Sequence, residues 1–164
     1  IEPAYNKLFQ NNGDLTFSDV TKTSGTEVLG IGSGVGNADL DDDGFLDLFL
    51  TNRTFYNSDK QITESDRNYL LRNKGNGNNW IKIELTGTKS NTNAYGARVK
   101  VMAGESIQYR EHTSAHGYNS ANDYRLHFGL ANEESIDSIE IIWPSGERQL
   151  LTDVAVNQTL SIEE

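Results

Sequence analysis

The feature that most restricts the fold of this chain is a strict alternation of apolar and polar residues in its second half. Within residues 80–85, Ile81, Ile83 and Leu85 alternate with Lys82 and Glu84. Successive side chains of a β-strand point to opposite faces, so this period of two is typical of a strand with one buried face. We therefore expect the three apolar residues to face a core, and Lys82 and Glu84 to face solvent.

Similar strand-like segments recur along the chain, and helical periodicity of useful length appears nowhere. In the second half we expect further strands at residues 98–101, 106–111, 124–128, 138–143, 148–152 and 159–163. In the first half the segments compatible with strands are residues 15–20, 28–38 and 45–51. The sequence therefore predicts an all-β fold, with residues 76–164 forming an antiparallel β-sandwich or jelly-roll-like domain.

A short internal repeat organises residues 1–75. The segment NKLFQNNG (6–13) returns as NYLLRNKG (68–75), and each copy has the form of a strand that ends in an Asn/Gly turn. The separation of the copies exceeds the roughly 40–50 residues of one propeller blade, so we expect the polar segment 56–66 to loop out. Residues 1–75 thus predict the strands of one propeller blade, which would need further blades to cover its faces and edges. Residues 75–79 predict a linker.

Composition and charge exclude several classes of protein. The 24 acidic and 14 basic side chains give a formal charge of -10, which disfavours nucleic acid and anionic lipid as partners. No cysteine is present, so disulfides, thiolate chemistry and Cys-type zinc sites are excluded. No apolar run is long enough to span a bilayer. The chain begins at Ile1 without a leader, and we expect it to be the interior or carboxyl-terminal part of a longer precursor.

The segment DLDDDGFLD (39–47) predicts a metal site. Calcium takes six to eight oxygen ligands at about 2.3–2.6 Å, and alternate side chains of a looping segment can all turn inward. We expect side-chain oxygens from Asp39, Asp41, Asp43 and Asp47, and a backbone carbonyl from Phe45. The cofactor that this set predicts is Ca²⁺.

Two alternatives to this calcium loop are weaker. An EF-hand requires a glutamate at loop position twelve and a helix on either side, whereas that position is Leu50, within a strand-like run. A solvated turn without metal would leave its carboxylates to repel one another. The flexible Gly44 fits the sharp bend that a calcium loop between two strands requires.

The acidic loop, the LFLTN segment (48–52) that follows it and the flanking repeats together resemble the FG-GAP/VCBS repeat. That family builds β-propellers and holds calcium in its acidic loops. The resemblance implies that residues 1–75 form part of a propeller blade. It also implies that Asp39, Asp41, Asp43 and Asp47 are the calcium ligands.

Residues 80–164 resemble the ASPIC/UnbV domain, which follows FG-GAP repeats in cartilage-acidic-protein-like proteins. Six motifs in the family's order carry this resemblance: GARV (96–99), QYRE (108–111), GYNS (117–120), HFGL (127–130), WPSG (143–146) and NQ (157–158). Together the two resemblances cover nearly the whole chain and imply a carboxyl-terminal fragment of such a protein. The family is associated with surface, matrix and adhesion proteins and with no established reaction.

The remaining charged residues of the second half predict no catalytic site. Arg98, Arg110 and Glu111 lie within strand-like segments, where they form either a structural ion pair or the wall of a ligand groove. His112 and His116 would need a helix to share one face, and the surrounding residues favour a loop instead. The WPSG motif is interpreted as a strand that runs into a turn, with Trp143 in the core.

Motifs for nucleophilic, nucleotide or phosphate chemistry are absent from the sequence. The glycine-rich segment 30–36 lacks the lysine and the helix of a phosphate-binding loop, and we interpret it as a strand with close backbone packing.

Three functions remain open. The first is a module that binds calcium and serves in ligand binding or adhesion, without catalytic activity. It would be secreted, periplasmic or at the cell surface, and its partners would be a protein or glycan ligand and the remaining propeller blades. The second is part of a secreted polysaccharide-active enzyme, which would need two carboxylates across a cleft. The third is a purely architectural cap for a propeller.

Overall fold

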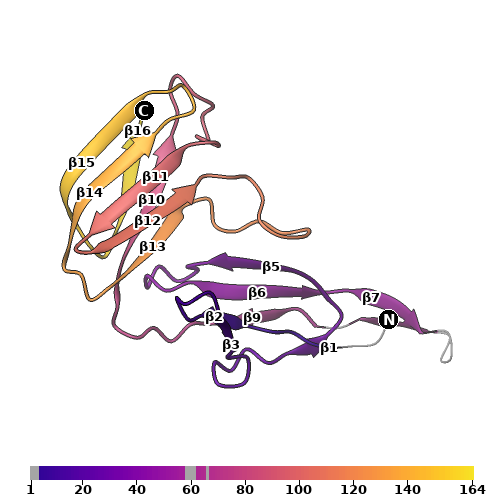
Figure 1. The fold of residues 1–164 in the computed structure, drawn as a ribbon. Coiled ribbons are helices and arrows are strands. Elements are labelled where there is room, and N and C mark those ends of the chain that lie inside the picture. The colour runs from indigo at the N-terminus through magenta and orange to yellow at the C-terminus, as the bar shows by residue number, and fades with distance from the viewer. Residues whose placement is uncertain (1–3, 58–61, 66) are drawn as a thin grey trace.

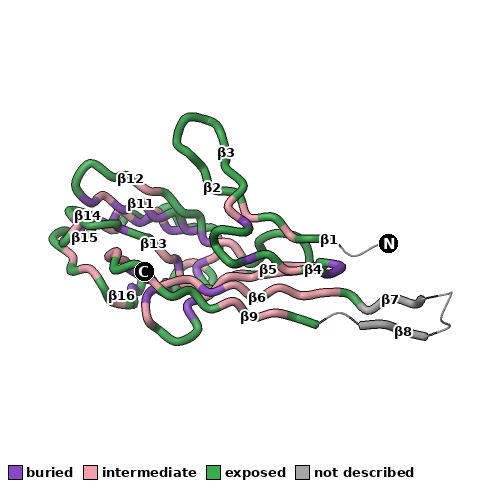
Figure 2. Tube along the Cα trace, turned by 90° about the horizontal axis from the view of Figure 1, so that it is seen from below, coloured by how far each residue is buried: buried purple, intermediate pink, exposed green. Residues whose placement is uncertain are grey.

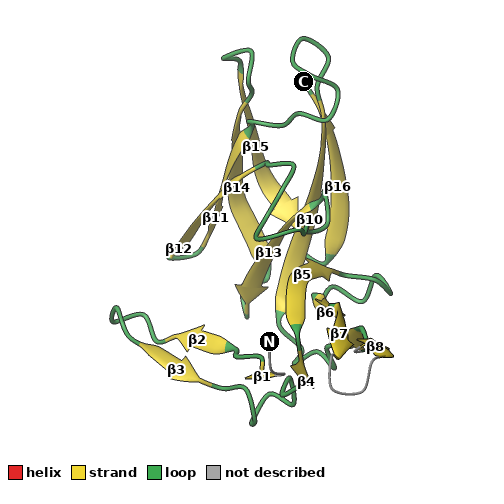
Figure 3. Ribbon diagram, turned by 90° about the vertical axis from the view of Figure 1, so that its right-hand side faces the viewer, coloured by secondary structure: helices red, strands yellow, loops and turns green. Residues whose placement is uncertain are grey.

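The computed structural model describes residues 4–57, 62–65 and 67–164, and every regular element among them is a β-strand (Figure 3). The predicted all-β fold is therefore confirmed. Among these residues there is no helix with the length and apolar character needed to cross a membrane.

The carboxyl-terminal half, residues 79–163, is a sandwich of two sheets (Figure 1). One sheet has the order β13-β10-β16, with β10 at Asn79–Thr86, β13 at Leu126–Ala131 and β16 at Gln158–Glu163. The other has the order β12-β11-β14-β15, with β11 at Arg98–Ala103, β12 at Ser106–Glu111, β14 at Ser135–Ile142 and β15 at Arg148–Ala155. The pairing departs from the predicted antiparallel pattern at one place, because β10 and β16 run parallel.

The core of the protein lies between these two sheets. Ile81, Ile83 and Leu85 of β10 are buried there, as their alternation predicts, and they meet the buried faces of β11 and β14. Trp143 joins the same core and is 2% exposed, which confirms its predicted place. The prediction for Lys82 was wrong. It lies on the outer face of β10 and yet is only 1% exposed, because another part of the chain covers it.

The amino-terminal half, residues 4–71, consists of small antiparallel sheets. The largest has the order β5-β6-β9, with β5 at Gly32–Ala38, β6 at Asp47–Asn52 and β9 at Tyr69–Leu71. Three strand pairs flank it: β1 (Ala4–Tyr5) with β4 (Leu29–Gly30), β2 (Phe9–Asn11) with β3 (Phe17–Asp19), and β7 (Thr54–Asn57) with β8 (Ile62–Ser65).

The segment predicted to loop out, residues 56–66, lies outside the β5-β6-β9 sheet as expected, but its described part forms strands. Residues 54–57 and 62–65 pair as antiparallel strands, so a polar hairpin takes the place of the expected loop. Residues 58–61 and 66 lie outside the described residues. Polar composition misled the prediction because strand pairing is made by backbone hydrogen bonds, which polar residues form as readily as apolar ones.

Burial differs sharply between the two halves (Figure 2). Nearly all the buried apolar residues belong to the sandwich, whereas Phe9, Phe17 and Leu29 of the amino-terminal half are about half exposed or more. Sheets of two or three strands with no covering layer cannot bury both faces. The amino-terminal half therefore depends on contacts beyond its own strands.

The internal repeat corresponds to a repeated turn. In the first copy the amide of Gly13 donates to the side chain of Asn11 at 2.8 Å, and in the second Gly75 donates to Asn73 at 3.0 Å. Both glycines have positive φ angles, 83° and 69°. The predicted Asn/Gly turns are thus confirmed in both copies, since only glycine adopts this backbone without strain.

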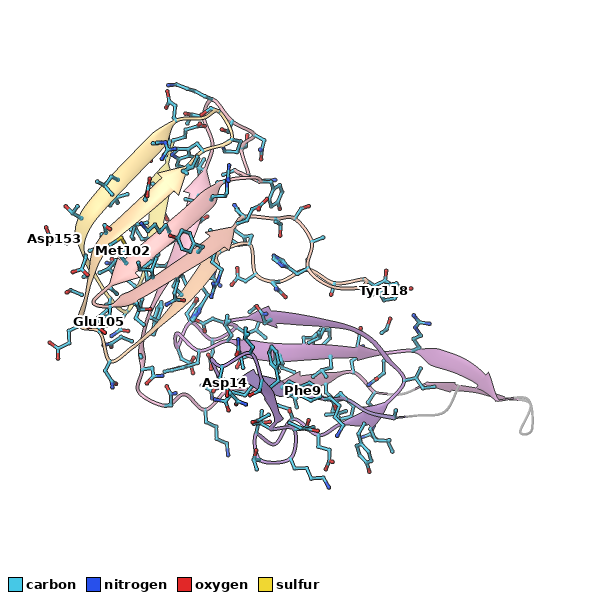
Figure 4. All side chains as sticks on the ribbon, viewed as in Figure 1. Phe9, Asp14, Met102, Glu105, Tyr118 and Asp153 are labelled. Carbon is cyan, nitrogen blue, oxygen red and sulfur yellow. The ribbon has the colours of Figure 1, made fainter. Side chains whose placement is uncertain are left out.

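A long arm, residues 112–125, leaves the sandwich after β12 and lies along the free edge of β5. The side chain of Asn122 accepts a hydrogen bond from the amide of Asn37 at 3.1 Å, and the amide of Asp123 donates to the carbonyl of Asn37 at 2.8 Å. A Cβ atom at Gly36 would lie 2.8 Å from a backbone oxygen of the arm. The predicted close packing of this glycine-rich strand is therefore confirmed, and Tyr118 lies at the tip of the arm (Figure 4).

Glu164 fastens the end of β16 to the loop after β10. One of its carboxylate oxygens accepts three consecutive backbone amides, from Thr88 at 3.1 Å, Lys89 at 2.9 Å and Ser90 at 2.7 Å. The other accepts the hydroxyls of Ser90 and Ser145. Partial desolvation alone would raise the pKa of Glu164, but these hydrogen bonds outweigh it and lower the pKa to about 2.

The Glu164 contacts predict a pH-dependent contribution to stability. Because the folded-state pKa lies below the ordinary 4.5, this contribution is present above pH 4.5 and is lost as the pH falls toward about 2. Thermal melts should therefore show Glu164→Gln clearly less stable than the wild type at neutral pH, with the gap closing across that range. The exposed neighbour Glu163 supplies the control as Glu163→Gln, and an equal gap at all pH values would contradict the assignment.

Candidate metal centre

The acidic loop connects β5 to β6 and is closed by its own carboxylates. The two side-chain oxygens of Asp39 accept the amides of Asp43, at 3.0 Å, and Gly44, at 2.9 Å. The carboxylate of Asp43 accepts the amide of Phe45 at 3.0 Å. Asp42 and Gly44 have positive φ angles of 56° and 91°, which Asp tolerates and glycine adopts freely. The spacing of acidic residues thus produces a tight, internally bonded turn.

Three of the five predicted ligands converge in this turn. Asp39, Asp41 and Asp43 each offer a carboxylate oxygen, and these oxygens lie within 4.8 Å of one another. Asp39 is buried, while Asp41 and Asp43 remain accessible to solvent. An ion at this cluster would therefore approach from the Asp41 and Asp43 side.

The other two predicted ligands lie beside the cluster. Asp47 is buried, and its oxygens accept the amides of Leu40 at 3.3 Å and Asn73 at 2.8 Å, so it ties the loop to the end of β9. Its oxygens are not part of the group formed by the other three carboxylates. The ligand roles of Asp47 and of the Phe45 carbonyl stay predictions.

Two cations of the carboxyl-terminal half contact the inner side of the loop. The ammonium of Lys82 donates to Asp39 and to Asp42, both at 2.7 Å. The guanidinium of Arg125 donates to Asp42 at 3.0 Å and forms a second ion pair with Asp123 at 2.6 Å. The loop is therefore bonded to the outer face of the sheet that contains β10 and β13.

These contacts fix the charge states of the groups involved. Burial works to lower the pKa of Lys82, but its hydrogen bonds to the carboxylates of Asp39 and Asp42 outweigh this and raise that pKa above its usual value. The pKa of Asp42 is lowered, mainly by the hydrogen bond from Lys82 and then by that from Arg125. Both Lys82 and Asp42 are consequently charged at neutral pH.

A third cation, Arg72, lies on the outer side of the loop. Its guanidinium forms an ion pair with Asp41 and approaches Asp43 at 3.5 Å. Arg72 is largely exposed, with 69% of its side chain accessible, so this contact is weak and readily exchanged. The three protein cations are fewer than the carboxylates around them, and the loop keeps an excess of negative charge.

The backbone of the loop is pressed against β10 and β13 at Gly44. The Nε2–H of His127 donates to the carbonyl of Gly44 at 2.8 Å, and the His127 ring stacks on Trp80 with centroids 6.4 Å apart. Burial lowers the pKa of His127, which favours the neutral ring. A Cβ atom at Gly44 would lie 1.8 Å from Nε1 of Trp80, so the contact admits no side chain.

Sequence reasoning did not predict Lys82, Arg125, Arg72 or His127 as neighbours of the loop. Lys82 and His127 are the outward residues of sheet strands, and a period of two identifies a face without showing what covers it. The only signal was the acidic excess of the loop itself, which requires cations from some source.

The other candidate residues of the second half form no second centre within the described residues. Arg98, Arg110 and Glu111 make no ion pair with one another, and the guanidinium of Arg110 lies 5.3 Å from the ring centre of Phe128. His112 is buried against Tyr95, where desolvation lowers its pKa. The structural ion pair expected among Arg98, Arg110 and Glu111 is not formed, because Arg110 lies over the Phe128 ring instead.

Comparison with known proteins identifies a family model that matches most of the carboxyl-terminal half. Residues 87–164 match the family model described as "ASPIC and UnbV". Cartilage acidic protein 1 of Mus musculus and of Homo sapiens are each 28% identical to this chain over 154 residues, which is 87% of the chain and 21% of the relative. The Xenopus tropicalis protein of the same name is 26% identical over 174 residues, 98% of the chain and 24% of the relative.

This chain thus spans between a fifth and a quarter of the length of those relatives. The predicted resemblance to the ASPIC/UnbV domain and to cartilage-acidic-protein-like sequences is confirmed. The family match begins at residue 87 and does not include the acidic loop. The resemblance of residues 1–75 to the FG-GAP/VCBS repeat stays a prediction.

The contact at Gly44 predicts a large effect of a single methyl group. Gly44→Ala should destabilise the protein by about 1–2 kcal/mol from its left-handed backbone and by roughly 1–3 kcal/mol more from overlap with Trp80. Gly146 has nearly the same φ angle, 92° against 91°, but open space around its Cβ position. Gly146→Ala therefore isolates the backbone term, and equal losses for the two variants in urea unfolding would refute the contact.

Proposed function

We propose that this chain is a calcium-stabilised binding or adhesion module without catalytic activity, and that it forms part of a longer protein outside the cytoplasm. In this proposal residues 1–75 are an FG-GAP/VCBS-type propeller segment and residues 76–164 a β-sandwich domain. The observation that carries the proposal is the convergence of Asp39, Asp41 and Asp43 in a loop closed by its own amides.

The donor set favours calcium over other ions. All the candidate ligands are oxygens, which hard cations prefer, and the chain has no cysteine to bind a softer metal. Magnesium demands a near-octahedral shell, whereas calcium accepts an irregular one completed by carbonyls and water. A loop whose carboxylates also bond its own amides offers such an irregular shell.

The position of Arg72 supports the fit of a cation. Its guanidinium lies at the outer carboxylates, Asp41 and Asp43, where the negative charge of the loop is accessible to solvent. An exposed arginine at this place acts as a stand-in for a more strongly held ion, and it must move aside when that ion binds.

The carboxylates near the loop favour a structural role over acid–base catalysis. A cleft of about 430 Å³ lies between the loop and the arm, lined by Asp39, Asp42, Asp47 and Asp123. Each of these four side chains is engaged by a protein donor. A hydrolase needs one carboxyl free to protonate a leaving group, and the name of the relatives, cartilage acidic protein 1, denotes no reaction.

A groove beside the arm is the proposed place for a protein or glycan ligand. It has a volume of about 570 Å³ and lies between the glycine-rich β5, the segment around Leu8 and the arm residues His116 and Tyr118. Concave, mainly apolar surfaces with a few polar groups are typical of ligand sites. An extracytoplasmic location also fits calcium, because many extracellular modules bind the ion only at about 10⁻⁴–10⁻³ M.

Calcium should bind and stabilise the chelator-treated protein. At about 10 mM the ion would exceed such a dissociation constant about ten- to hundredfold, which corresponds to about 1.4–2.7 kcal/mol and roughly 3–10 °C in Tm. Calorimetric titration and thermal melts measure both quantities. Asp41→Asn combined with Asp43→Asn should abolish the response, whereas Asp153→Asn, on the far side of the sandwich (Figure 4), should leave it intact.

Arg72→Gln tests the same site through a substitution that should strengthen calcium binding. Removal of the competing guanidinium should tighten calcium binding by a few fold, on the order of 1 kcal/mol or less for so exposed an ion pair. Arg148→Gln is the matched control, because Arg148 is equally exposed and pairs with Glu140 at 3.2 Å, remote from the loop. Absence of calcium heat in the wild type would refute the calcium site.

The non-catalytic role predicts binding without turnover. A panel of extracellular polysaccharides and proteins, incubated with the calcium-loaded protein, should show saturable binding to some members and no released products. Tyr118→Ala, at the tip of the arm, should weaken that binding by altering the groove. Released oligosaccharides would instead establish the polysaccharide-active enzyme.

A further inference from the structure

The acidic loop is covered on its inner side by residues that belong to the other half of the chain. Lys82, on β10, is among the most buried side chains of the molecule, and both of its carboxylate partners come from the loop. Asp39 and Lys82 have side-chain exposures of 0% and 1%. This is an ion pair between two parts of the chain that are far apart in sequence, shielded from water at both ends.

A second set of contacts at the same place involves the backbone of the loop. The carbonyl of Gly44 accepts the hydrogen bond from His127, and the loop backbone lies against Trp80 so closely that no Cβ fits. Arg125 adds a bond of 3.4 Å to the backbone carbonyl of Asp39. The loop therefore rests on β10 and β13 through side chains and backbone together.

The two sides of the loop serve different cations. Asp39 and Asp42 bond to Lys82 on the inner side, whereas Asp41 and Asp43 face Arg72 and solvent on the outer side. Asp39 also holds the amides of Asp43 and Gly44, so one carboxylate links the inner contact to the shape of the outer cluster.

We propose that the acidic loop is a joint that fastens the amino-terminal half to the sandwich, with the ammonium of Lys82 on its inner side and a divalent metal ion on its outer side. The outer part rests on the calcium function proposed above, and the inner part does not. One loop conformation serves both cations, so each binding event favours the other by reciprocal linkage. Lys82 is in this sense a positioning residue for the metal loop.

The joint predicts that calcium stabilises strands that it does not touch. Hydrogen exchange of the full chain, followed by mass spectrometry, separates β6, next to the loop, from β14, deep in the sandwich. In the wild type, calcium should slow exchange in both strands. In Lys82→Met it should slow exchange in β6 alone, because the ion pair that couples the loop to the sandwich is lost.

The metal-free protein tests the inner side by itself. Lys82→Met leaves Asp39 buried without a partner, so exchange in β6 should be at least about tenfold faster than in the wild type. Lys100→Met is the control, since Lys100 lies on the opposite sheet with its ammonium 6.0 Å from the Tyr109 ring centre. The double variant Asp39→Asn with Lys82→Met removes both charges, so no buried charge is left without a partner. It therefore separates loss of the ion pair from unfolding of the variant. It should keep both halves folded while losing the calcium response of β14.

The outcomes separate the two proposals. If Lys82→Met matches Lys100→Met in β6 exchange and still transmits the calcium effect to β14, the joint is overturned. If calcium slows nothing in the wild type but Lys82→Met still accelerates β6, the calcium function is overturned and the inner contact is supported. If calcium slows β6 in the wild type without slowing β14, calcium binding is supported and the joint is overturned.

Discussion

The two halves of this protein meet at a buried ion pair between Lys82 and Asp39. Removal of both charges from water costs several kcal/mol for each ion, and their attraction offsets this only when the remaining hydrogen-bonding positions are also filled. Here the carboxylate also accepts the amides of Asp43 and Gly44, and the ammonium also bonds Asp42. Such a pair tolerates little displacement, so it specifies one arrangement of the loop on the sheet.

Much of the fold follows from local pattern. The alternation in β10 predicted its buried face, residues 106–111 form β12 as expected, and Trp143 lies in the core. Errors arose where a local pattern carries no information about neighbours. Lys82 has the sequence context of a solvent-facing residue, and the loop that buries it lies about 40 positions away. The parallel pairing of β10 with β16 likewise depends on topology that alternation cannot show.

The part of the candidate site that lies within one loop was predictable from the sequence, and the part contributed by other segments was not. The spacing of acidic residues was sufficient to identify Asp39, Asp41 and Asp43 as a group, because local geometry alone brings alternate side chains of a tight turn together. The ligand role of Asp47 stays a prediction, and in this structure its oxygens accept the backbone amides of Leu40 and Asn73. The cations were beyond reach, since Lys82 and Arg125 arrive through tertiary contacts.

The placement of the aromatic residues has a spectroscopic consequence. Both tryptophans of the chain belong to the sandwich: Trp143 is enclosed in its core, while Trp80 stacks on His127 beneath the acidic loop. Indole emission of this protein therefore contains one signal from the interior and one from the seam between the halves, and none from β1–β9. Quenching by a small soluble agent would act first on the partly accessible Trp80. Trp80 emission therefore reports whether the acidic loop is in contact with β10 and β13.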